Sequence, residues 1–247
     1  EGKTSGCSAS VGVAIAISNM LDPDRVVMDA DTALYHAKTQ GKARWSFFTE
    51  EMHAKSLETK KLASDLLVAS EREEFLPYFQ PLVDARTGKI VSAEALVRWD
   101  HPARGILAPA QFLDTAEQMG ILKRLDEIVF AKLGAVIDRF DKVGADLPRV
   151  AVNVSAARLA DPTFVHDIRS SGIAPERLTV EILESVYLDR MGGVVRWTID
   201  ELDELGVTIA LDDFGTGHAS VSGLLEIRPT ILKVDRGFIF PIVAKED

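Results

Sequence analysis

From residue 74 onward, apolar runs typical of buried strands alternate with runs typical of helices. Strands are expected at 75–83, 90–98, 149–154, 178–183, 207–211 and 230–234. Helices are expected at 109–119, 122–141, 162–169, 194–205 and 220–227. Successive strand–helix units favour a parallel sheet or barrel covered by helices, so the fold class is α/β. The strands are too few for a complete eight-stranded barrel, and a barrel would need closing elements beyond the sequence.

The first 73 residues follow a different pattern. A buried strand at 8–17, a helix at 23–39 and a strand at 44–48 would bury too little surface to form a domain. We therefore expect 1–49 to be the last part of a separate domain. Residues 50–73 are charged and helix-forming, with leucines spaced as on an amphipathic helix, which predicts a connecting helix. Its apolar stripe could also pack against a second copy of the chain, and 74–247 then forms the second domain.

Charge and cysteine content limit the partners and the compartment. The 247 residues include 38 acidic and 28 basic side chains, a formal net charge of -10. This balance argues against nonspecific binding to DNA, RNA or an anionic membrane surface. The single cysteine, Cys7, cannot form an intrachain disulfide, and no apolar run approaches the roughly 20 residues that span a bilayer. We therefore expect a cytoplasmic location, with any membrane-anchored portion upstream of residue 1.

Polar side chains lie close to the carboxyl ends of the expected strands, where βα-barrel enzymes carry their active sites. Asp212 and Asp213 follow the apolar run 207–211 and precede a glycine-containing turn. Because adjacent like charges repel, a site that keeps both ionised usually supplies a cation. Further polar residues close to strand ends are Glu94, Asn153, Glu181, Lys233 and Asp235. Carboxylate and amide oxygens are hard ligands that suit Mg²⁺ or Mn²⁺.

Each of these residues also has a plain structural explanation. Asp212 could cap the following helix, and Asn153 could do the same in its own turn. Glu94 begins a Glu-Ala-Leu run of good helix formers. Glu181 could form an exposed helical pair with Glu184, and Lys233 could be a surface lysine. Taken together these explanations are unsatisfactory, because each would have to place its polar residue near a strand end independently.

The same residues form motifs that resemble the EAL domain, the family of cyclic di-GMP phosphodiesterases. The matching segments are YFQP at 78–81, EALVRW at 94–99, VNVS at 152–155, EILES at 181–185, DDFGTG at 212–217 and KVDR at 233–236. The segment ALYHAK at 33–38, before Gly41, resembles the end of a GGDEF domain, the diguanylate cyclase family. The resemblance implies a TIM-like (β/α) barrel of the EAL type that lacks its last βα elements, preceded by a GGDEF remnant.

The resemblance also implies a site. Glu94, Asn153, Glu181 and Asp212 would hold one Mg²⁺ or Mn²⁺, and Asp212 with Asp213 would hold a second ion. Lys233 would position the attacking water or the phosphate, which makes Lys233, Glu94 and Asp212 the catalytic candidates. Gln80, Leu96, Arg98 and Asp235 would contact cyclic di-GMP, and the product would be linear pGpG. Two metal ions suit this chemistry because they stabilise a phosphodiester transition state and offset the substrate's negative charge.

The chain differs from the usual family pattern at three places. Family members usually have Gln in place of Arg158, Thr in place of Leu183, and Tyr-Ser-Ser in place of 218–220. The family also supplies a further metal-binding Glu and a late Gln from elements downstream of Lys233. A second hypothesis is therefore a receptor that binds cyclic di-GMP without hydrolysing it and signals through the connecting helix. A third is an unrelated barrel phosphohydrolase with the same metal site.

Overall fold

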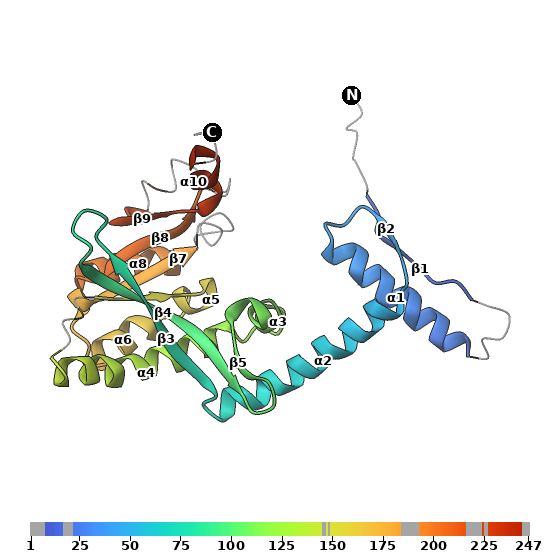
Figure 1. The fold of residues 1–247 in the computed structure, drawn as a ribbon, viewed down its shortest axis with the longest axis horizontal. Coiled ribbons are helices and arrows are strands. Elements are labelled where there is room, and N and C mark those ends of the chain that lie inside the picture. Colours follow the sequence, from blue (N-terminus) through green and yellow to red (C-terminus); the bar gives the residue numbers. More distant parts are fainter. Residues whose placement is uncertain are drawn as a thin grey trace. The chain divides into compact units, whose positions relative to one another are not determined.

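The computed structural model describes residues 8–16, 22–144, 147, 149–183, 193–215, 224 and 227–243, and the side chains of these up to residue 240. The chain divides into two compact units, Glu1–Asp65 and Leu66–Asp247, and each is described by itself (Figure 1). In the part that the structure describes, no helix is both long enough and apolar enough to cross a membrane.

The first unit contains a small βαβ arrangement. Strand β1 (Val11–Val13) pairs in parallel with β2 (Trp45–Phe47), and helix α1 (Pro23–Thr39) connects them. Gly12 allows β1 to lie directly on α1, because a Cβ added there would be 2.0 Å from the Ala30 carbonyl oxygen. The expectation of a buried strand over 8–17 was wrong in length and in burial. The strand is short, and Val11 is 49% exposed.

A helix, α2 (Glu50–Glu71), lies where the connecting helix is expected, and its role as a connector stays a prediction. Some of its leucines are buried and others are exposed. Leu62 and Leu66 are buried, whereas Leu57 and Leu67 are each more than half exposed.

The second unit is built on one open sheet. Its strands are β3 (Phe75–Val83), β4 (Ile90–His101), β5 (Gly105–Leu107), β6 (Val150–Asn153), β7 (Leu178–Leu183), β8 (Thr208–Phe214) and β9 (Ile231–Val234). Among the described residues the order is β3-β4-β6-β7-β8-β9, with β5 paired to β4. The hairpin β3–β4 is antiparallel, and every later pair along this order is parallel. The α/β fold class is confirmed, and the described strands form an incomplete barrel.

Helices pack against one face of this sheet and form the main core. The helices and turns are η1 (Pro109–Gln111), α3 (Leu113–Gln118), α4 (Leu122–Lys142), α5 (Ala156–Leu159), α6 (Thr163–Ser170), η2 (Pro175–Arg177), α8 (Gly193–Glu204) and α10 (Arg236–Val243). Apolar residues of β4, β6, β7 and β8 lie in one buried cluster with residues of α4, α6 and α8. Figure 1 shows where these helices and strands lie in the second unit. Because side chains alternate along a strand, the residues between these apolar positions face the other side of the sheet.

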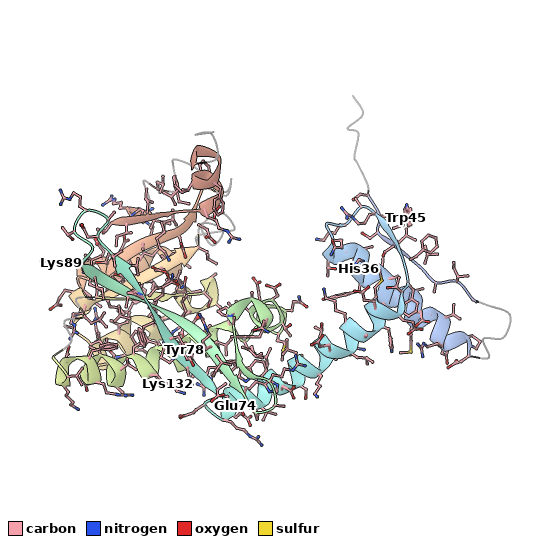
Figure 2. The ribbon with its side chains drawn as sticks, viewed as in Figure 1. His36, Trp45, Glu74, Tyr78, Lys89 and Lys132 are labelled. Carbon is pink, nitrogen blue, oxygen red and sulfur yellow. The ribbon has the colours of Figure 1, made fainter. Side chains whose placement is uncertain are left out.

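The start of the sheet is fixed by polar contacts to α4 and β4. Lys132 of α4 donates hydrogen bonds of 2.8 Å to the carbonyl oxygens of Glu73 and Phe75. The indole N–H of Trp99 donates to Glu74 Oε2 at 3.0 Å. Figure 2 labels Glu74 and Lys132 beside the start of β3. These contacts anchor the hairpin that carries Gln80 and Glu94.

The structure differs from the expected elements in several places. The helix expected at 109–119 is divided into η1 and α3. Strand β8 continues through Asp212 and Asp213 to Phe214, beyond the end expected at residue 211. Short or late elements β5, α5 and α10 were not expected, and most of the helix expected at 220–227 lies outside the described residues.

Substitution of Gly12 by alanine tests the packing of the first unit. Gly12→Ala is expected to cost about 3 kcal/mol of local stability, because its Cβ would overlap backbone atoms of Ala30 and Leu34. Hydrogen exchange of the α1 amides should then be faster. Gly193→Ala is the control, since its added Cβ meets nothing within 4 Å. Unchanged protection of α1 in Gly12→Ala would show that the close packing is wrong.

Candidate metal centre

Five polar side chains project from the face of the sheet opposite the helices, those of Glu94, Asn153, Glu181, Asp212 and Lys233. The pairing of the strands brings them together. Asn153 of β6 is directly paired with Glu181 of β7, and Glu94 of β4 is paired with the residue two before Asn153. Glu181 is paired with Ala210, two residues before Asp212 on β8, and Ala210 is paired with Ile231, two before Lys233 on β9. Paired residues face the same way, so period-two alternation places all five on one face.

The carboxylate cluster consists of Glu94, Glu181 and Asp212. One oxygen of each lies within 4.8 Å of the others, and the group could hold a metal ion. Lys233 Nζ donates to all three, at 3.0 Å to Glu94 Oε2, 2.7 Å to Glu181 Oε2 and 3.1 Å to Asp212 Oδ2. Asn153 Nδ2 donates to Glu94 Oε1 at 2.8 Å, which leaves its Oδ1 as the atom suited to face a cation.

The electrostatics of the cluster favour a further cation. Burial raises the pKa of Glu181 to about 7; the Lys233 hydrogen bond opposes this rise, whereas the nearby Glu94 charge adds to it. Burial acts to lower the pKa of Lys233, but hydrogen bonds to the carboxylates outweigh it and the pKa is raised. Lys233 therefore stays protonated at neutral pH. When all three carboxylates are ionised, one ammonium leaves two negative charges uncompensated. One divalent cation would neutralise them.

The donor set fits Mg²⁺ or Mn²⁺. Carboxylate and amide oxygens are hard ligands, and no thiolate or imidazole belongs to the group. The Lys233 ammonium occupies the place of a cation in this cluster. Carboxylate oxygens from three strands surround it, which shows that the cluster binds a positively charged group.

Asp213 lies beside the cluster but outside it. Its φ of 55° is in the left-handed region, which residues other than glycine adopt infrequently, although Asp tolerates it. The Asp213 N–H donates to Asp212 Oδ1 at 3.0 Å. The exposed Asp213 side chain is not among the three clustered carboxylates. Asp235 also lies outside the cluster, and its Oδ1 accepts the Gly237 N–H at 2.8 Å, as in a helix cap.

The three remaining candidates, Gln80, Leu96 and Arg98, face the same side of the hairpin as Glu94. Gln80 is directly paired with Glu94 and is exposed. Arg98 lies four residues beyond Glu94, or about 13 Å along the strand. Its Nη1 donates to the Val97 carbonyl at 2.8 Å, and its guanidinium lies 5.6 Å from the centre of the Tyr78 ring.

The plain structural explanations fail for most of these residues. Glu94 lies in a strand, and Ser155 rather than Asn153 caps helix α5. Glu181 is buried in β7, and Lys233 is held by three carboxylates. Cys7, Glu184 and residues 216–220, including the altered 218–220 segment, lie outside the described residues.

Arg158, at a position where the resemblance implies Gln, is a buried ion-pair residue. It bonds to Asp161 and Asp167, lies 3.6 Å from a Glu127 oxygen and covers the Phe164 ring. These contacts connect α5 to its neighbouring helices. Leu183, the other departure in the described part, ends β7 and is 41% exposed.

Sequence reasoning missed Asp126. Its Oδ2 accepts the Ser155 N–H at 2.9 Å, two residues after Asn153. The one signal in the sequence is an acidic residue between the apolar Leu125 and Ile128 of a predicted helix. The structure shows both of these neighbours buried in α4.

Comparisons with known proteins agree with this geometry. The sequence profile described as "EAL domain" matches residues 63–247. The chain is 34% identical over 245 residues to a bifunctional diguanylate cyclase/cyclic di-GMP phosphodiesterase, MucR, of Pseudomonas aeruginosa. That match covers 97% of this chain and 36% of MucR. This chain is also 33% identical over 238 residues to cyclic di-GMP phosphodiesterase PdeR of Escherichia coli, and that match covers 94% of this chain and 35% of PdeR. The chain thus spans about a third of the length of these curated relatives.

A solved structure is similar as well. The cyclic di-GMP complex of the PaMucR phosphodiesterase superposes with a TM-score of 0.63 at 32% identity, covering 76% of each chain.

Replacing Lys233 tests whether the cluster needs a cation. Without divalent ions, Lys233→Met is expected to lose about 3 kcal/mol of unfolding free energy, because the buried Glu181 and the half-buried Glu94 and Asp212 lose their counter-charge. Mg²⁺ should restore most of this loss and stabilise the variant more than the wild type. Denaturant unfolding with and without Mg²⁺ measures both effects.

The matched control is Lys123→Met, which removes a partly exposed lysine that pairs with Asp161 at 2.8 Å. It should lose less stability and gain no extra response to Mg²⁺. A Lys233→Met loss that Mg²⁺ leaves unchanged would contradict the cluster's need for a cation.

Proposed function

We propose that this chain, which belongs to the EAL domain family, is a metal-dependent phosphodiesterase that hydrolyses cyclic di-GMP to linear pGpG. The observation that carries the proposal is the convergence of Glu94, Glu181 and Asp212 around Lys233 on one sheet face. The relatives MucR and PdeR, named as cyclic di-GMP phosphodiesterases, support the choice of substrate. A receptor without turnover would have no need to keep this carboxylate cluster.

Glu94, Asn153, Glu181 and Asp212 would hold the first Mg²⁺ or Mn²⁺, and Asp213 would join Asp212 in holding a second. When bound, such ions supply positive charge to the phosphodiester and lower the pKa of the attacking water. The left-handed backbone at Asp213 supports its role in holding the second ion. In a regular strand the side chains of Asp212 and Asp213 would point to opposite faces, and the left-handed φ of Asp213 breaks this alternation.

The chain's own residues would orient the reactants. With a cation on the carboxylates, the protonated Lys233 ammonium can donate to the phosphate or to the water. Arg98 would bind a phosphate through its planar guanidinium, and Gln80, Leu96 and Asp235 would contact the rest of the dinucleotide. In the overall reaction one water adds across one P–O bond of the ring. One phosphodiester is cut, and the linear dinucleotide carries a terminal phosphate and a hydroxyl.

We also propose that 1–49 is the end of a GGDEF domain and that this domain is a partner within the same protein. The match to MucR supports this, since it covers 97% of the chain and the relative is named bifunctional. A cytoplasmic location is proposed from composition, because one cysteine cannot form an intrachain disulfide.

Glu94→Ala in the full-length protein tests the proposed reaction. It should lower Mg²⁺- or Mn²⁺-dependent formation of pGpG by about 10³-fold, or about 4 kcal/mol of transition-state stabilisation, because it removes a carboxylate from the cluster. Chromatographic separation of cyclic di-GMP and pGpG measures the rate. Glu204→Ala, an exposed glutamate on α8, is the control and should keep full activity.

Two outcomes would reject the proposal. Full activity of Glu94→Ala would remove the cluster from the reaction. Binding of cyclic di-GMP by the wild type without any pGpG in either metal would instead identify a receptor.

A further inference from the structure

The turn that follows Asn153, the last residue of β6, is held at two consecutive residues. Val154 N–H donates to the Glu181 carbonyl oxygen on β7 at 3.0 Å. Ser155 N–H donates to Asp126 Oδ2 on α4 at 2.9 Å. The turn is therefore attached to the sheet on one side and to a helix on the other, immediately after the candidate ligand.

The Asp126 carboxylate holds Ser155 by its backbone N–H. The Ser155 hydroxyl oxygen accepts the Arg158 N–H at 3.3 Å and caps α5. Burial raises the pKa of Asp126 to about 6, while the contacts with Ser155 and the Arg158 charge oppose this rise. At pH 7.5 Asp126 is thus mainly an ionised acceptor, the form that makes the stronger hydrogen bonds.

We propose that Asp126 is a positioning residue for the metal centre: by holding Ser155 it fixes the β6–α5 turn and aims the Asn153 amide at the carboxylate cluster. Asn153 has two side-chain torsions, so the place of its Oδ1 follows closely from the backbone beside it. Its Nδ2 is already held by Glu94 Oε1 at 2.8 Å. The proposal rests on the proposed function only in taking Asn153 as a ligand of the divalent ion.

The surrounding contacts indicate that α5 stays folded when Asp126 is changed. Arg158 on α5 bonds to Asp161 and Asp167, and it lies 3.6 Å from Glu127 on α4. Leu159 of α5 is fully buried. Loss of Asp126 should therefore loosen the turn between Asn153 and α5 without releasing the helix.

The test compares metal affinity in nucleotide-free protein. Asp126→Ala should weaken Mn²⁺ binding, measured by calorimetry, by about 10-fold or more, the usual effect of removing a residue that orients a ligand. Asp126→Asn should have a smaller effect, because its amide oxygen can still accept the Ser155 N–H. Amide hydrogen exchange at Val154 and Ser155 should rise in the same order without metal.

The matched control is Asp141→Asn. Asp141 lies at the other end of the same helix and accepts two hydrogen bonds from Arg177, at 2.7 and 2.9 Å. This variant should lose stability with no change in Mn²⁺ affinity. An equal loss of Mn²⁺ affinity in Asp141→Asn and Asp126→Ala would show that general destabilisation is the cause and would overturn the proposal.

A double-mutant cycle tests whether Asp126 acts through Asn153. In an Asn153→Ala background, Asp126→Ala should cause no further loss of Mn²⁺ affinity. Additive losses, or wild-type affinity in Asp126→Ala, would overturn the inference while leaving the proposed reaction intact.

Conversely, a wild type that binds Mn²⁺ but forms no pGpG would reject the proposed function, and the cycle would still decide the role of Asp126. Absence of Mn²⁺ binding by the wild type would overturn both.

Discussion

Repulsion among three carboxylates on β4, β7 and β8 of one sheet is the constraint on which this site depends. Glu94, Glu181 and Asp212 can all stay ionised this close together only when positive charge accompanies them, and Lys233 supplies part of that charge. Glu181 is 2% exposed, so water screens it poorly. One ammonium against three ionised carboxylates leaves a deficit that a divalent cation would remove. Here the same interaction serves folding and function, because Lys233 connects β9 to β4, β7 and β8 across the sheet.

The sheet separates two tasks by its alternation. Residues such as Val152 and Ile182 pack against the helices, while Asn153 and Glu181 beside them face the other side. A slip of one residue in β4, β7 or β8 would place a carboxylate in the apolar core, so burial fixes the register of these strands. Beyond the strands, the site depends on turns held by distant groups, as Ser155 is held by Asp126.

Period-two alternation and strand ends were enough to anticipate much of this arrangement. Glu94, Asn153, Glu181 and Asp212 were selected from their places in the sequence, and the structure brings them together; their roles stay predictions. The contact of Asp126 with Ser155 could not be predicted, because it joins residues 29 apart on different elements. Strand β8 was expected to end at residue 211. It continues through the left-handed Asp213 to Phe214, and no local sequence pattern predicts this continuation. Strand β1 was expected to be buried because its apolar residues resemble those of a core strand, but Val11 is exposed and the other two residues are only partly buried.

The most direct measurement is an anomalous difference map from crystals of the protein soaked in Mn²⁺. We expect a peak among the oxygens of Glu94, Asn153, Glu181 and Asp212, with Lys233 displaced from at least one carboxylate. At saturating Mn²⁺, a cluster without a peak and with all three Lys233 ion pairs intact would contradict the assignment of this site as a metal centre.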